Sequence, residues 1–181
     1  MFKREFGEFI GEIKFKVLDE RQMRASAGIM FLLGLFASIN AFLLQRYIVV
    51  PYIAGFLVLN FMIGIIINPK YSPTVILARL FVGKQTPLYI GAAQKKFAWS
   101  LGLILASVIF VLSFPLLTNE TYFRPVCLLC ILCLILLYLE TAFAICIGCK
   151  IYRLFIRMKI LPEPEVNPNC MGDACDVETE S

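Results

Sequence analysis

The sequence has no histidine among its 181 residues. This absence excludes a histidine-ligated haem, a zinc site built from histidine and cysteine, and histidine as a general base. Charge is also scarce: 17% of residues are charged, whereas 60% are hydrophobic and the mean hydropathy is +0.81. Soluble domains usually have about 25% charged and about 45–50% apolar residues. The composition therefore excludes an ordinary soluble domain and a disordered chain.

Basic residues outnumber acidic ones by 17 to 13. They stand between apolar segments and are not grouped with aromatic residues. A nucleic-acid surface gathers lysine and arginine on one face, whereas basic residues beside apolar segments are typical of membrane proteins. We therefore expect the lipid bilayer, and not nucleic acid, to be the main partner of this chain.

Four apolar runs are each long enough to cross a bilayer as a helix. Their cores cover residues 27–44, 48–67, 97–117 and 125–149. A hydrocarbon layer of about 30 Å needs about 20 helical residues, and no run has the polar stripe of a helix in a soluble bundle. We predict an all-α, polytopic membrane protein with four transmembrane helices in a membrane domain over residues 26–160.

The loop charges predict one orientation of these spans. If the N-terminus is cytoplasmic, 15 of the 17 basic residues lie on the inner side, and Arg46 and Arg124 lie outside. Inner loops of membrane proteins are enriched in lysine and arginine. We therefore expect a multi-pass protein of the bacterial plasma membrane with both termini in the cytoplasm.

Three segments outside the four runs have their own character. Residues 1–25 carry an apolar stripe opposite charged residues, which predicts an amphipathic helix on the inner membrane surface or, alternatively, against the protein's own inner loop. In that loop, Ser72 and Pro73 are typical of a helix start and Gly83 of a helix end, so we expect a short interfacial or re-entrant helix. Residues 161–181 hold three prolines and six acids and predict a flexible acidic cytoplasmic tail with two cysteines.

Seven cysteines are the remaining unusual chemistry. Two pairs lie at opposite ends of the fourth run: CLLC, with Cys127 and Cys130, at the outer end, and CIGC, with Cys146 and Cys149, at the inner end. About 24 Å of helix separates Cys130 from Cys146, which is too far for direct thiol exchange. Each pair therefore closes on itself or with a partner brought to it.

The outer pair has a plausible activation. Cys127 falls in the first turn of the predicted helix, close to Arg124 and to the positive end of the helix dipole, and both favour a thiolate. Cys127 and Cys130 are therefore candidate catalytic residues. Alternatively, these cysteines and Cys133 are small hydrophobic residues that pack within the membrane.

Glu140 is the sole charge in the fourth run, and it shares a helical stripe with Cys133. A carboxyl at that depth is costly and has to face protein or water. We expect a proton-handling or substrate-binding role. The candidate substrate-binding residues are Glu140, Cys133, Asn40 and Asn60. Alternatively, Glu140 is protonated and hydrogen-bonded to an asparagine or to Ser107 on a neighbouring span.

The inner pair, CIGC, is a stronger candidate for a chemical role than the outer pair. It lies where the fourth run meets the cytoplasm, Gly148 between the cysteines permits local bending, and Lys150 follows at once. Cytosolic thiols are normally kept reduced, so a pair placed there is more often catalytic, redox-sensing or metal-binding than structural. We predict Cys146 and Cys149 as the main catalytic residues.

Two further cysteines in the tail permit a metal site. Cys146, Cys149, Cys170 and Cys175 form the spacing C-x2-C, a gap, and C-x4-C, which would supply four thiolates to zinc or an iron–sulfur cluster. This site requires that the fourth helix run on to about Ile160 and that the tail return to its base. Alternatively, the tail dithiol shuttles electrons or sulfur to CIGC.

Four strings carry a family resemblance. They are DERQMRASAG at 19–28, NPKYSPTVILARLF at 68–81, GAAQKKFAWSLGL at 91–103 and LETAFAICIGCKIY at 139–152. Together they resemble the bacterial membrane family called domain of unknown function 4395, over about residues 16–155. The resemblance implies a small multi-pass protein, often encoded near thioredoxin-like or rhodanese-like proteins, without an established activity. The family features fall on Ser72, Pro73, Arg79, Lys96, Glu140, Cys146, Gly148 and Cys149, whereas CLLC and the tail cysteines do not match.

Three functions remain open from the sequence. The first is thiol–disulfide exchange or persulfide relay through CIGC with a thioredoxin-like or rhodanese-like partner, which requires no cofactor. The second is transport of a small sulfur compound by a homo-oligomer, because four spans are few for a solute path. The third is a four-cysteine metal-binding or scaffold module without catalysis.

Overall fold

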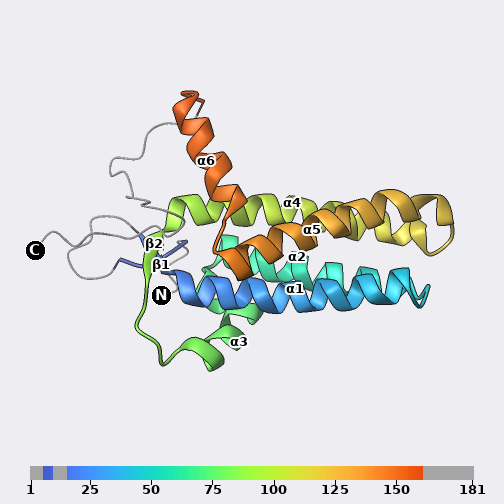
Figure 1. The fold of residues 1–181 in the computed structure, drawn as a ribbon, viewed down its shortest axis with the longest axis horizontal. Helices are drawn as coiled ribbons and strands as arrows, with labels where there is room; N and C mark the ends of the chain where they lie inside the picture. Colours follow the sequence, from blue (N-terminus) through green and yellow to red (C-terminus); the bar gives the residue numbers. More distant parts are fainter. Residues whose placement is uncertain (1–5, 10–15, 161–181) are drawn as a thin grey trace, which may run out of the picture.

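The computed structural model describes residues 6–9 and 16–160, in which four long helices lie side by side (Figure 1). These helices are α1 (Glu20–Phe42), α2 (Val49–Ile66), α4 (Ala92–Leu116) and α5 (Phe123–Phe143). Each falls within a segment long and apolar enough to cross a membrane. The prediction of an all-α fold with four such helices is therefore confirmed.

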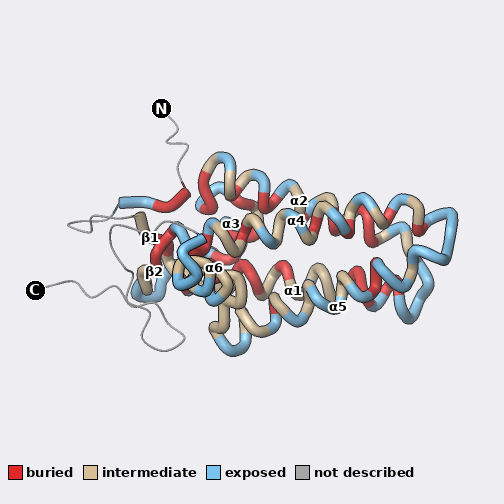
Figure 2. Tube along the Cα trace, turned by 90° about the horizontal axis from the view of Figure 1, so that it is seen from above, coloured by how far each residue is buried: buried red, intermediate tan, exposed pale blue. Residues whose placement is uncertain are grey.

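The bundle packs through small residues on the inside and exposes large apolar residues on the outside. A Cβ added to Gly28 of α1 would meet Thr141 of α5 at 3.2 Å, and one added to Gly34 would meet Leu134 at 3.3 Å. Small residues let membrane helices approach closely. The outward faces, pale in Figure 2, include Leu32, Phe36, Leu59, Ile104, Val111, Leu128 and Ile135. Such a surface is suited to contact with lipid.

The short elements gather at one end of the bundle (Figure 1). Strands β1 (Val17–Asp19) and β2 (Tyr89–Gly91) form an antiparallel pair, and we call this end the strand end. Helix α3 (Pro73–Val82), preceded by the 3-10 turn η1 (Pro69–Tyr71), also lies there, as does α6 (Ile147–Arg157). The opposite end holds two connections, one of them the 3-10 turn η2 (Glu120–Tyr122).

The expected amphipathic helix over residues 1–25 is wrong for its described part before Glu20. Val17 pairs with Gly91 in the two-stranded sheet, and Glu8 forms an isolated bridge with Val17. Phe6 is buried with its ring edge-on to Trp99, so this segment packs on the protein. Helix α1 begins at Glu20, ahead of the apolar run that starts at residue 27, because Asp19 caps it. Residues 1–5 and 10–15 lie outside the described residues.

The predicted single helix from Pro125 to Cys149 and on to about Ile160 is also wrong. Helix α5 ends at Phe143, and Ala144 takes a left-handed conformation with φ 58°. Helix α6 then turns away from the bundle axis (Figure 1). Aromatic contacts hold α6 in this direction: the ring centroid of Phe97 in α4 lies 5.5 Å from that of Tyr152, in a tilted pair, and 6.0 Å from that of Phe155, in an edge-on pair.

The expected short helix in the loop is confirmed as α3, from Pro73 to a C-cap at Gly83. Its docking depends on a buried polar cluster. The Asn60 Oδ1 atom accepts hydrogen bonds from the Ser72 hydroxyl at 2.6 Å, the Thr74 hydroxyl at 2.9 Å and the Thr74 amide at 3.0 Å. The Thr74 hydroxyl also bonds that of Ser26 in α1 at 2.7 Å. One asparagine therefore holds α3 against α2.

Replacing Asn60 with alanine should reduce the free energy of unfolding by about 1–3 kcal/mol, because three buried hydrogen bonds to its side chain are lost and the Thr74 amide is left without its acceptor. Thermal unfolding in detergent and protease cleavage after Gly83 both measure the release of α3. The matched control is Asn40→Ala, because the side chain of Asn40 donates to the carbonyl of Phe36 in its own helix and contacts no other element through a described hydrogen bond. Asn40 is also buried but makes a single side-chain hydrogen bond, so we expect this control to lose less stability than Asn60→Ala. Equal losses in the two variants would contradict the role of Asn60.

Candidate functional site

A disulfide joins Cys146 and Cys149 at the junction of α5 and α6, with their Cα atoms 5.2 Å apart. Cys146 is the N-cap of α6, and its sulfur accepts a hydrogen bond from the Cys149 amide at 3.3 Å. This position follows from the break at Ala144, which ends α5 and allows α6 to begin at Ile147. Cys146 therefore lies at the positive end of a helix dipole, where negative charge on sulfur is stabilised.

The two sulfur-bearing residues differ in accessibility. Cys146 is half-buried, whereas Cys149 is 9% exposed. The reason is the close contact of α6 with α4: a Cβ added to Gly148 would lie 2.6 Å from the Cβ of Ala98. Gly148 is thus needed for helix contact and not, as expected from the sequence, for bending. A reagent arriving from solvent meets Cys146 first.

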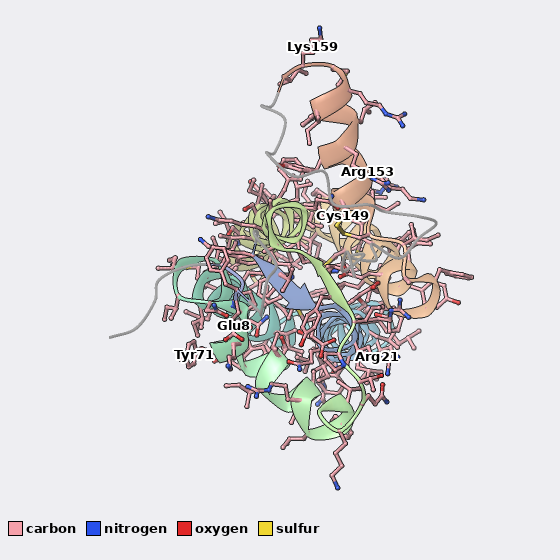
Figure 3. The ribbon with its side chains drawn as sticks, turned by 90° about the vertical axis from the view of Figure 1, so that its left-hand side faces the viewer. Glu8, Arg21, Tyr71, Cys149, Arg153 and Lys159 are labelled. Atoms are coloured by element: carbon pink, nitrogen blue, oxygen red, sulfur yellow. A yellow bond between two sulfur atoms is a disulfide. The ribbon has the colours of Figure 1, made fainter. Side chains whose placement is uncertain are left out.

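A small cavity of about 30 Å³ adjoins the disulfide. Half of its lining residues are charged, and Figure 3 shows Cys149 and Arg153 on the same side of the strand end. The lining residues are Glu20, Ile90, Lys95, Ala144, Cys146, Cys149, Lys150 and Arg153. Three cations beside two sulfurs favour the thiolate form when the pair is reduced.

One lining residue of this cavity, Lys95, belongs to an ion pair. The Lys95 ammonium of α4 donates to Glu140 Oε1 of α5, and their side chains are 4% and 21% exposed. The partner of Glu140 is therefore Lys95, and not Asn40, Asn60 or Ser107 as the sequence alternative had it. Sequence reasoning missed this pair because it placed the start of the third span at residue 97. Helix α4 begins earlier, at Ala92, so Lys95 lies in the helix and packs beside the end of α5.

Glu20 is a second residue that sequence reasoning missed. It is 7% exposed, and its Oε1 atom pairs with Arg24 at 3.1 Å. Its Oε2 atom is buried and has no hydrogen-bond partner among the described residues. The available signal was an acid placed directly before an apolar run, which can mark either a helix start or a site.

The outer cysteines lie apart from the disulfide. Cys127 is buried near the start of α5, and Cys130 and Cys133 are half-buried; all three are free thiols. Cys130 and Cys133 line a separate apolar cavity of about 30 Å³ between the long helices. A cavity of that size holds about one water molecule.

The four predicted substrate-binding residues do not form one site. Asn40 bonds within α1, Asn60 holds α3, and Cys133 lines the apolar cavity, whereas Glu140 pairs with Lys95 beside the disulfide. Of this set, the structure brings only Glu140 near the inner cysteines. Their spread follows from their positions along the long helices.

The proposed four-cysteine metal site stays a prediction. Within residues 6–9 and 16–160, no group of three or more potential metal ligands comes together. Cys170 and Cys175 lie outside these residues. In the disulfide form, Cys146 and Cys149 have no thiolate to offer zinc or an iron–sulfur cluster.

The comparisons with known proteins gave one match. A family model described as Domain of unknown function (DUF4395) matches residues 18–157. No curated protein and no solved structure matches the chain. The matched segment reaches from β1 to the end of α6 and includes every residue around the disulfide cavity.

Proposed function

The chain belongs to this family, Domain of unknown function (DUF4395), and we propose that it exchanges disulfides with a soluble dithiol protein through Cys146 and Cys149. The observation that carries the proposal is the disulfide at the N-terminus of α6, formed by a half-buried Cys146 and a buried Cys149. The three cations of the adjoining cavity support it, because they favour a thiolate leaving group.

The exchange proceeds through a mixed disulfide. A partner thiolate attacks the Cys146 sulfur, the bond to Cys149 breaks, and Cys149 leaves with the electron pair and takes up a proton. The second partner thiol then attacks the partner's own sulfur in the mixed disulfide and releases Cys146. The partner is oxidised to a disulfide and the pair is reduced to a dithiol; the reverse sequence oxidises the pair.

The partner class is a protein of thioredoxin-like or rhodanese-like chemistry at the cytoplasmic side of a bacterial plasma membrane. Charge supports this orientation: within the described residues, Arg46 and Arg124 are the two cations at or near the end opposite the strand end. The remaining described cations lie at or near the strand end, beside the disulfide. Such a bias is typical of a cytoplasmic face.

The test uses the full chain in detergent with the other five cysteines replaced by serine. After reduction, glutathione disulfide is added and mixed disulfides are counted by intact mass. We expect Cys149→Ser to accumulate a mixed disulfide at Cys146. The matched variant Cys146→Ser should react at least about tenfold more slowly, because Cys149 is buried and lacks the N-cap position.

Two results would contradict the proposal. One is that an oxidant leaves the alkylation of the reduced pair unchanged, which means that no disulfide forms. The other is that both single variants react equally fast, which means that the position at the start of α6 does not control reactivity.

A further inference from the structure

The buried carboxylate of Glu20 is unexplained by the exchange steps above. Its Oε1 atom has Arg24 as a partner, whereas Oε2 has no hydrogen bond within the described residues. A buried carboxylate oxygen without a partner costs free energy and calls for a reason. Glu20 also lines the cavity that the two disulfide cysteines line. A residue with an unpartnered carboxylate oxygen and the redox pair therefore line one cavity.

One exchange step needs a base in this space. When the pair is reduced and a partner disulfide reacts with Cys146, the thiol of Cys149 has to lose its proton before it can attack the mixed disulfide. Cys149 is 9% exposed, so bulk water reaches it poorly. A cavity of about 30 Å³ has room for about one bridging water molecule.

We propose that Glu20 accepts the proton of Cys149 during resolution of the mixed disulfide and returns it in the reverse direction. This inference rests on the proposed function. The proton passes from the Cys149 sulfur to Glu20 Oε2, directly or through one water. The Cys149 thiolate then attacks the Cys146 sulfur, the bond to the partner sulfur breaks, and the partner leaves with the electron pair. The pair is oxidised to a disulfide and the partner disulfide is reduced.

The charged groups around Glu20 favour this assignment. Arg24 of α1 holds Oε1, and Lys95 of α4, itself paired with Glu140 of α5, lines the same cavity. Two cations of α6, Lys150 and Arg153, complete its charged lining. Among the described residues that line this cavity, Glu20 is the one carboxylate. Glu20 is therefore the carboxylate of this lining that is placed to accept a proton.

The test separates the two thiol steps in one experiment. The reduced full chain, with its other five cysteines replaced by serine, is mixed with dithionitrobenzoate and the release of thionitrobenzoate is followed. The first release reports attack by Cys146, and the second reports resolution by Cys149. We expect Glu20→Gln to slow the second release by about 100-fold, the low end for loss of a positioned base. The first release should keep its rate.

The pH profile and two control variants exclude a purely structural role. In the parent two-cysteine chain, in which Glu20 is intact, the second release should show an acid limb set by a carboxyl, and in Glu20→Gln it should rise with hydroxide concentration instead. Arg24→Gln breaks the same ion pair but keeps the carboxylate, so it should retain most of the second rate. Glu8→Gln removes a carboxylate that pairs with Lys70 elsewhere at the strand end (Figure 3), and should change neither release.

The outcomes distinguish this inference from the proposed function. Equal second rates in Glu20→Gln and the unmodified protein, or an equal loss in Arg24→Gln, overturn the role of Glu20 and leave the exchange intact. Absence of a second release in the unmodified protein overturns both. If Glu20→Gln does not fold, the pH profile of the second release in the parent two-cysteine chain decides. A profile without an acid limb set by a carboxyl overturns the inference.

Discussion

Replacing Lys95 with methionine is expected to reduce the free energy of unfolding by about 3–5 kcal/mol, the usual cost of removing one partner from a buried ion pair. Lys95 is 3% exposed and donates to Glu140, whose side chain is 21% exposed. Methionine keeps the length and apolar stem of lysine, so the main loss is the ammonium. Glu140 would then carry a charge with little access to water. Denaturant unfolding in detergent micelles measures the change.

Two further variants show whether the loss comes from the unpaired charge. Lys96→Met removes the neighbouring lysine, which is exposed, and should change stability by less than about 0.5 kcal/mol. The double variant Lys95→Met with Glu140→Leu removes both charges and should recover most of the stability. If the double variant loses the sum of the two single losses, the residues do not act as a pair.

The long helices could be predicted because their signal is local. A run of about 20 apolar residues is sufficient for a span, and the runs at 27–44, 48–67 and 97–117 correspond to α1, α2 and α4. The ends of α3 were also encoded locally, in the serine before it, the proline at its first position and the glycine after it. These features need no knowledge of what packs against them.

The strand end could not be predicted because its structure depends on distant contacts. The segment before Glu20 has a helical stripe of apolar residues, but backbone pairing of Val17 with Gly91 overrides that preference. The end of α5 has no proline and no glycine at Ala144, so nothing local marks the left-handed residue that separates α5 from α6.

The candidate site was predicted in part. The spacing of Cys146 and Cys149 identified the pair, because the spacing of two cysteines is a local property. Its charged surroundings come from α1, α4 and α6 and depend on how these helices cross. Glu20 and Lys95 gave no separate signal, since acids and lysines beside apolar runs are ordinary features of membrane proteins. Long-range packing, and not residue type, makes them part of the site.

Replacing Gly148 with alanine should displace α6 and expose Cys149. Helix propensity alone predicts the reverse, because alanine stabilises a helix by about 1 kcal/mol relative to glycine. Packing opposes this gain: the added Cβ would lie 2.6 Å from the Cβ and 2.7 Å from the Cα of Ala98. Since a backbone atom cannot rotate aside, α6 has to move, which we expect to cost about 1–3 kcal/mol.

The measurement is the alkylation rate of Cys149 in the reduced protein, with its other cysteines replaced by serine. Each 1.4 kcal/mol lost from the closed state gives about tenfold more open state, so a rise of about tenfold is expected. Gly34→Ala is the matched control, since its Cβ would meet only the end of the Leu134 side chain at 3.3 Å. An unchanged rate in Gly148→Ala would mean that contact with α4 does not keep the second sulfur buried. The separation of an accessible from a buried sulfur, on which ordered exchange depends, would then need another cause.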